Sequence, residues 1–99
     1  MDNTTAAQGF SALGSEARIA VYRTLVRAGE AGLPVGEIQK RTDIPASTLA
    51  HHIKFLSSAD LILQEKQGRS IICRANYDHL QLLASFILEE CCAEPESTS

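Results

Sequence analysis

Residues 45–58 read PASTLAHHIKFLSS, a stretch with a regular apolar spacing and several small polar and cationic residues. Leu49, Ile53 and Leu56 follow the spacing i, i+4, i+7, which predicts a helix over residues 46–59 with one apolar face. Pro45 suits the start of that helix, because the first helical positions need no amide donor. The opposite face carries small polar and cationic side chains, namely Ser47, Thr48, His51, Lys54 and Ser58. That face is either a solvated surface or a binding surface.

Three helices are predicted before this stretch, over residues 6–13, 15–28 and 35–42, and residues 1–5 are expected to be mobile. Ser15 suits the N-cap of the second helix, since its hydroxyl can accept from a free amide of the next turn. Gly29 and Gly32 follow the end of that helix, and residues 43–45 form a tight connection after the third. The apolar residues of the second helix are predicted to face inward: Ile19, Tyr22, Leu25 and Val26.

A β-hairpin and a final helix are predicted after the stretch. Two apolar runs over residues 61–66 and 70–75 read as strands, joined by Gln67, Gly68 and Arg69. The last helix, over residues 77–92, is apolar on most sides, so it should pack on a second copy as well as on its own domain. We therefore predict a two-fold homodimer. The fold class is mainly α with a small β-hairpin, a winged helix-turn-helix in the order α-α-α-α-β-β-α, with residues 1–92 as one domain and 93–99 as a short flexible tail.

Length and composition exclude several classes of protein. A chain of 99 residues is one domain by size. No run approaches the length of a membrane-spanning helix, so we expect no membrane partner. The first residues do not read as a secretory signal, and three cysteines without one favour a reducing, cytoplasmic location.

Charge is unevenly distributed along the chain. The formal net charge is −3. Residues 35–74 nevertheless hold six Lys or Arg against four Asp or Glu, whereas residues 75–99 hold five acids and no base. A locally basic face can therefore bind phosphate although the chain as a whole is acidic.

This order of elements favours DNA binding. A helix fits the major groove of B-DNA, where Ser47, Thr48, His51 and Lys54 can reach base edges and phosphates. The hairpin tip can bring Arg69 to the adjacent backbone or into the minor groove. A winged helix can also serve as a protein-interaction module. The sequence has no Gly-rich loop or carboxylate pair, so we expect neither an enzyme nor a required cofactor.

Three segments carry a family resemblance: LGSEAR at residues 13–18, STLAHHIKFL at 47–56, and Gly68 with Arg69. Together they resemble the ArsR/SmtB family of bacterial repressors over about residues 10–92. The resemblance implies a homodimer built on the first and last helices, which binds an operator overlapping its own promoter and leaves it when an inducer binds. It also assigns the DNA-binding residues by matching position: Ser47, Thr48, His51, His52 and Lys54 in the reading helix, and Arg69 at the wing tip.

Within the reading helix, His52 lies nearer the apolar side, with Phe55 three residues on, and is expected to pack rather than to read bases. Two positions depart from the family pattern. Ala50 replaces a frequent Ser, which removes one contact to DNA, and Asp60 replaces a frequent Gly, where Asp tolerates a left-handed backbone.

The resemblance narrows the choice of inducer. The family's Cys-Val-Cys metal site falls on residues 34–36, which hold no cysteine, and its zinc-type site has Leu80 where a histidine should stand. Cys91 and Cys92 resemble the terminal pair of the arsenic-responsive subgroup, in which a pair without a third cysteine suits methylarsenite, while others bind arsenite. Alternatives are a packing role for the pair, sensing of redox or sulfur species, or no inducer at all. Cys73 is expected to be a half-buried packing residue.

Overall fold

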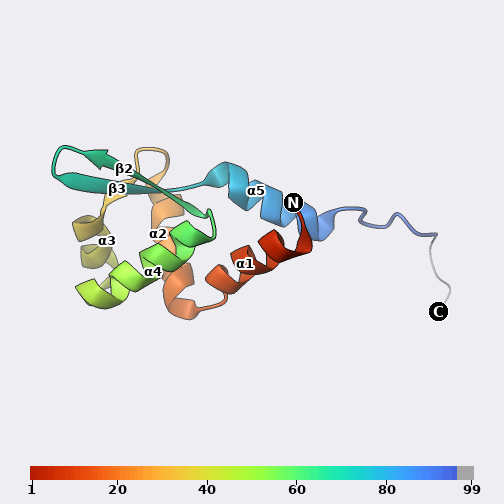
Figure 1. Ribbon diagram of the computed structural model, residues 1–99, viewed down its shortest axis with the longest axis horizontal. Helices are drawn as coiled ribbons and strands as arrows, with labels where there is room; N and C mark the ends of the chain where they lie inside the picture. Colours follow the sequence, from red (N-terminus) through yellow and green to blue (C-terminus); the bar gives the residue numbers. More distant parts are fainter. Residues whose placement is uncertain (96–99) are drawn as a thin grey trace.

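The computed structural model describes residues 1–95 and contains five helices and three strands. The helices are α1 (Asn3–Leu13), α2 (Glu16–Ala28), α3 (Val35–Thr42), α4 (Ala46–Ser58) and α5 (Tyr77–Leu88). The strands are β1 (Leu33–Pro34), β2 (Ile62–Gln67) and β3 (Ser70–Ala75). Figure 1 shows the hairpin of β2 and β3 at one end of the molecule, with α1 and α5 side by side toward the other. In the described part of the chain, no helix has the length and apolarity needed to cross a membrane.

The core lies where α2 packs against α3 and α4. Its largest fully buried side chains include Leu25 of α2, Ile38 of α3, and Leu49 and Leu56 of α4. The predicted inward face of α4 is confirmed. The prediction for α2 was partly wrong: its inward residues are Val21, Tyr22, Thr24 and Leu25, whereas Ile19 and Val26 are exposed.

The strands form one antiparallel sheet in the order β1-β3-β2. Gln67 pairs with Ser70, so the hairpin turn consists of Gly68 and Arg69 alone. Gly68 has a φ of 62° and Arg69 is not in the positive-φ region, which is the backbone of a type II′ turn. The two-residue strand β1 was not predicted, because it is too short to show an alternating pattern; Leu33 pairs with Cys73.

Local sequence signals account for several helix ends. The Ser15 hydroxyl accepts from the Arg18 amide at 3.3 Å, as predicted for an N-cap. Asp60 has a φ of 62°, which confirms that it takes the left-handed conformation often given to glycine. α1 begins at Asn3 rather than residue 6, since the Asp2 carboxylate caps it by accepting from the Thr5 amide at 2.8 Å. Residues 3–5 therefore belong to a helix and are not a mobile lead-in.

The end of the last helix differs from the prediction. α5 stops at Leu88 instead of residue 92, and turns follow it. Glu90 and Cys92 both have positive φ, which an α-helix cannot contain. Cys91 and Cys92 therefore lie beyond the helix. Of the predicted tail, residues 93–95 are exposed and non-helical, and residues 96–99 lie outside the described residues.

α1 and α5 approach each other closely at Gly9. A Cβ built on Gly9 would lie 2.5 Å from Cδ1 of Leu83, so a larger residue at this position of α1 would require the Leu83 side chain to shift. Leu83 is the one buried residue of α5. The rest of the helix leaves large apolar side chains exposed, with exposed fractions of 55% for Leu82, 63% for Ile87 and 64% for Leu88.

Candidate nucleic-acid interface

The outer face of α4 carries the polar and cationic side chains that the sequence singled out. Ser47, Thr48, His51 and Lys54 are all exposed, and His52 is half-buried. Ser47, His51, Lys54 and Ser58 follow one another at i, i+4, i+7 and i+11, so they form a stripe along one side of the helix. This stripe lies opposite the buried Leu49, Ile53 and Leu56. The amphipathic pattern therefore orients α4 with its polar side toward solvent.

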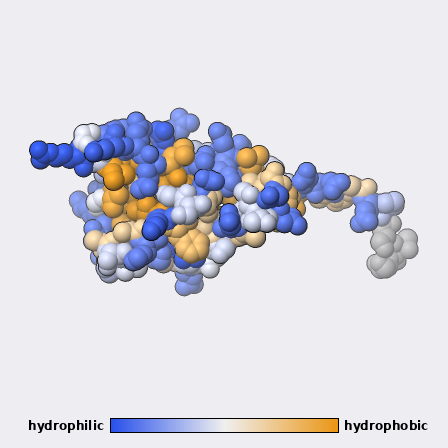
Figure 2. Space-filling model, viewed as in Figure 1, coloured by the Kyte–Doolittle hydropathy of each residue, from blue (hydrophilic) through white to orange (hydrophobic). Residues whose placement is uncertain are grey.

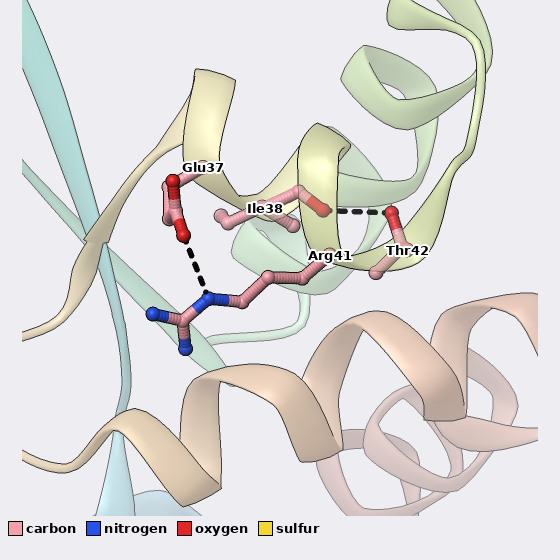
Figure 3. Close-up of polar contacts among 4 residues, drawn as sticks. All are labelled: Glu37, Ile38, Arg41 and Thr42. Atoms are coloured by element: carbon pink, nitrogen blue, oxygen red, sulfur yellow. Dashed lines mark hydrogen bonds and ion pairs between the residues drawn. The ribbon is translucent and has the colours of Figure 1, made fainter.

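α3 and the turn after it fix where α4 begins. Asp43 ends α3 with a left-handed φ of 56°, and Pro45 precedes the first residue of α4. Within α3, the Thr42 hydroxyl donates to the Ile38 carbonyl at 2.8 Å, and Nε of Arg41 lies 3.0 Å from Oε1 of Glu37 (Figure 3). α3 and α4 thus form a helix-turn-helix unit packed on α2.

Two of the basic side chains in this region form ion pairs with carboxylates and are therefore partly neutralised. Arg41 pairs with Glu37, and Arg74 pairs with Glu65 at 3.4 Å. These are the two ion pairs found among residues 1–95. Of the six basic residues between positions 35 and 74, the ones in neither pair are Lys40, Lys54, Lys66 and Arg69. They lie on α3, α4 and the hairpin, which makes this end of the molecule the locally basic one.

Arg69 occupies the second position of the hairpin turn and is exposed. Hydrophilic atoms project beyond the rest of the surface at the hairpin tip in Figure 2. The tip is held to the body of the molecule through the base of the sheet, where Nδ2 of Asn76 donates to the Asp60 carbonyl at 2.9 Å. The α4 stripe and the hairpin tip are therefore two separate polar projections on one rigid unit.

One contact with α4 was missed by the sequence analysis. The Arg18 guanidinium lies over the Phe55 ring, with Cζ 4.1 Å from the ring centroid. Arg18 also donates from Nε to the Ala12 carbonyl at 2.7 Å and from Nη2 to the Ser11 carbonyl at 3.1 Å. Leu49, Ile53 and Leu56 make up the buried side of α4, and Phe55 lies outside it and is exposed. The predicted apolar face of Leu49, Ile53 and Leu56 did not include Phe55, but nothing local in the sequence indicated its contact with Arg18.

The cysteines fall into two environments. Cys73 is fully buried on β3 rather than half-buried, which bears out its packing role. Burial raises the pKa of the Cys73 thiol, partly offset by a hydrogen bond from Gln64 at 3.8 Å. Cys91 and Cys92 are exposed, and their Sγ atoms lie 3.3 Å apart. Over residues 1–95, no group of three or more His, Cys, Asp or Glu side chains is arranged to hold a metal ion.

Comparison with known sequences identifies related regulators. A family profile described as a helix-turn-helix domain matches residues 13–65. The uncharacterized HTH-type transcriptional regulator YceK of Bacillus subtilis (strain 168) is 33% identical over 88 residues, which covers 89% of this chain and 87% of that protein.

Solved structures of the same architecture agree. The ArsR-like transcriptional regulator from Rhodococcus sp. RHA1 superposes with a TM-score of 0.78 at 28% identity, covering 91% of this chain and 81% of that one. The homodimeric winged helix-turn-helix DNA-binding domain Mb0332 (fragment 1–100) from Mycobacterium bovis has a TM-score of 0.71 at 19% identity, covering 97% and 89%. The second likeness concerns the fold alone. Together they confirm the predicted winged helix-turn-helix class.

Proposed function

This chain belongs to the ArsR family of helix-turn-helix transcriptional regulators, and from that premise we propose that it is a repressor, which binds operator DNA as a homodimer and leaves it when an inducer binds. The observation that carries the proposal is the exposed polar stripe on α4 together with an exposed Arg69 at the hairpin tip. A single helix of this kind fits the major groove, and the wing then lies next to the neighbouring backbone.

Each DNA-binding residue has a role that suits its chemistry. Ser47, Thr48 and His51 come from the first half of α4 and carry the hydrogen-bonding groups for base edges. Lys54, one turn further, supplies a charge for a phosphate, and Arg69 supplies another from the wing or enters the minor groove. We take residues 1–92 as the unit that binds DNA and dimerises, and we propose that it works in the cytoplasm.

The homodimer is supported by apolar surface at the other end of the chain. Leu82, Ile87 and Leu88 on α5, with Phe10 on α1, are exposed although they are large and apolar. We call this group the α1–α5 apolar surface. A monomer that left it in water would lose the free energy of burying it, about 1.5–3 kcal/mol for each fully buried side chain. A second copy covers the same surface on both partners by two-fold symmetry.

As inducer we propose trivalent arsenic, either methylarsenite or arsenite, bound by Cys91 and Cys92. Three features support this assignment: both thiols are exposed, they are neighbours in the chain, and their sulfurs are 3.3 Å apart. Thiolates prefer such soft, thiophilic species, and binding displaces the thiol protons. A regulator that responds to redox or sulfur species, or that has no inducer, is the alternative.

DNA binding is tested first, with the DNA upstream of the protein's own gene. We expect affinity that falls steeply with salt, because phosphate contacts release counterions. His51→Ala and Lys54→Ala should each weaken binding about tenfold, whereas Arg23→Ala, which removes an exposed cation of α2, should not. No salt-dependent affinity for any duplex would instead favour a winged-helix protein-interaction module.

The inducer is tested by titrating arsenite, methylarsenite, antimonite and zinc against the preformed complex. Release by an arsenical that is abolished in the Cys91→Ser/Cys92→Ser variant would establish the thiol pair as the sensor. A complex indifferent to all four would reject the arsenic proposal and leave the repressor proposal standing. Cys73→Ala is the matched control, because this thiol is buried away from the pair.

A further inference from the structure

A groove of about 800 Å³ runs between α1 and α4. Its lining comes from one side of each helix: Thr4, Ala7, Gln8 and Ser11 of α1, and His51, Lys54, Phe55, Ser58 and Ala59 of α4. White and pale-orange surface, of intermediate to apolar hydropathy, is visible in Figure 2 where α4 meets α1. The volume lies within the range of about 300–1,000 Å³ that small-molecule sites occupy.

An aromatic ring fixed in place forms part of this lining. Phe55 is 44% exposed, so part of its ring is available at the surface of the groove. The Arg18 guanidinium stacks on it, and two main-chain carbonyls at the end of α1 hold that guanidinium. Arg18 therefore fixes the ring in place, and the exposed part of the ring contributes apolar surface to the groove. Ala7 and Ala59 extend this apolar area without filling the space above it.

The lining has one charged side chain, the Lys54 ammonium. Lys54 and His51 are the titratable residues among those that line the groove, and no lining residue is acidic. Neither ion pair found in residues 1–95 involves Lys54. A ligand that complements the groove therefore combines a flat apolar body with an anionic group, since a cation would meet the Lys54 ammonium without a counter-charge.

We propose that the groove between α1 and α4 binds an aromatic carboxylate, with the ring system against Phe55 and the carboxylate at Lys54 beside His51. Lys54 and His51 are also two of the side chains assigned to DNA, so the bound carboxylate and the DNA phosphates compete for them. This competition rests on the proposed function, whereas ligand binding does not. The groove is thereby a second regulatory input, separate in place and in chemistry from the thiol pair.

The binding test uses 2-naphthoate as the probe and the neutral 2-naphthamide as its matched analogue, titrated calorimetrically into the full chain without DNA. We expect 2-naphthoate to bind about tenfold more tightly, because only the carboxylate can pair with Lys54. Lys54→Gln should remove that difference. Equal affinity for the two probes, or no binding of 2-naphthoate at millimolar concentration, would overturn the proposal.

A groove-filling variant tests the position of the site. Ala7→Phe puts a ring into the groove and should weaken 2-naphthoate binding at least tenfold, whereas Ala20→Phe, on the exposed face of α2, should leave it unchanged. Ser11→Leu on the same wall serves if Ala7→Phe does not fold. Unchanged affinity in the folded variant would remove the ligand from this groove. Loss of the dimer in Ala7→Phe, with no 2-naphthoate binding by the unsubstituted chain, would assign the groove to a second copy and reject the ligand.

The competition is measured separately, by adding 2-naphthoate to the protein–DNA complex. DNA should be released from the unsubstituted chain and from Ala20→Phe, but not from Ala7→Phe. Binding of 2-naphthoate without release of DNA would contradict the shared use of Lys54 and His51. If the chain does not bind DNA at all, the calorimetric titration still decides the binding site, so the two failures are distinguishable.

Discussion

The hairpin end and the α5 end of this molecule differ in how far their apolar side chains are exposed to solvent. Around α4 and the hairpin, Leu49 and Leu56 are fully buried, and the exposed large apolar side chains, Phe55, Leu63 and Ile71, are 43–46% exposed among polar and charged groups. Along α5, Leu83 is buried while Leu82, Ile87 and Leu88 face solvent. The apolar side chains of α5 are therefore the more exposed, which supports the proposed dimer interface there. The difference fits the proposal that this chain of 99 residues contacts DNA at one end and a second copy at the other.

The largest expected effect is a loss of stability at Gly32, which packs against strand β3 of the hairpin. Gly32 has a φ of 70°, and a Cβ there would lie 2.5 Å from the Cys73 carbonyl oxygen of β3. Gly32→Ala should therefore cost at least about 3 kcal/mol of unfolding free energy, from the left-handed backbone and the overlap together. Urea denaturation measures it. Gly29→Ala is the control, since Gly29 also has a positive φ but no atom within 4 Å of its would-be Cβ. Equal losses in both variants would show that the overlap relaxes.

The next effect concerns the α5 end. Leu82→Glu puts a charge on the α1–α5 apolar surface and should weaken dimerisation about a hundredfold, as removal of a central apolar side chain from an interface does. Sedimentation equilibrium measures the change. Gln81→Glu adds the same carboxylate to the neighbouring exposed position and should leave the dimer intact. A dimer unaffected by Leu82→Glu would mean that the two copies meet elsewhere.

A smaller effect tests whether Lys54, at the hairpin end, contacts a DNA phosphate. Lys54→Gln should reduce the slope of log affinity against log salt by about 0.9 for each phosphate that the ammonium neutralises, or about 1.8 for a dimer. Fluorescence anisotropy with a labelled duplex, from low to physiological salt, gives the slope. Arg23→Gln on α2 should leave it unchanged. A slope that does not move with Lys54 would mean that this side chain is not near a phosphate.

The smallest effect concerns the buried Tyr22 of α2 and the pH dependence of unfolding. Burial raises the pKa of Tyr22 to about 12, with a contribution from Tyr77, and its hydroxyl has no hydrogen-bond partner among the described residues. A raised folded-state pKa stabilises the fold below the unfolded value near 10, and this stability is lost as the pH rises toward 12. Tyr22→Phe should change stability by less than about 1 kcal/mol at pH 7 and should lose less of it between pH 9 and 11.

The measurement for Tyr22→Phe is the urea midpoint at several alkaline pH values. Cys73 remains in the variant and has a raised pKa as well, so some loss of stability with rising pH should persist. Parallel pH profiles for the two proteins would exclude Tyr22 as a source of the alkaline dependence.

The sequence predicted most of the hairpin end and less of the α5 end, for physical reasons. Periodic apolar residues, Pro45 and the turn residues Gly68 and Arg69 are local signals, and they predicted α4 and the hairpin to within a residue or two at each boundary. Cys91 and Cys92 are apolar and follow Leu88 after only Glu89 and Glu90, so the sequence extended α5 by four residues past its true end. Strand β1 and the Arg18–Phe55 contact depend on residues far apart in the chain, and no local pattern indicates them.

The close approach of Gly9 and Leu83 has a consequence for how this chain can change over evolutionary time. The two positions share one fixed volume, because a methyl group on residue 9 would overlap the end of the Leu83 side chain. A mutation that enlarges residue 9 requires the Leu83 side chain to move, and a smaller residue at 83 removes that requirement. Among descendants of this sequence the two positions should therefore covary in size, and the order of the two substitutions along a lineage should be constrained.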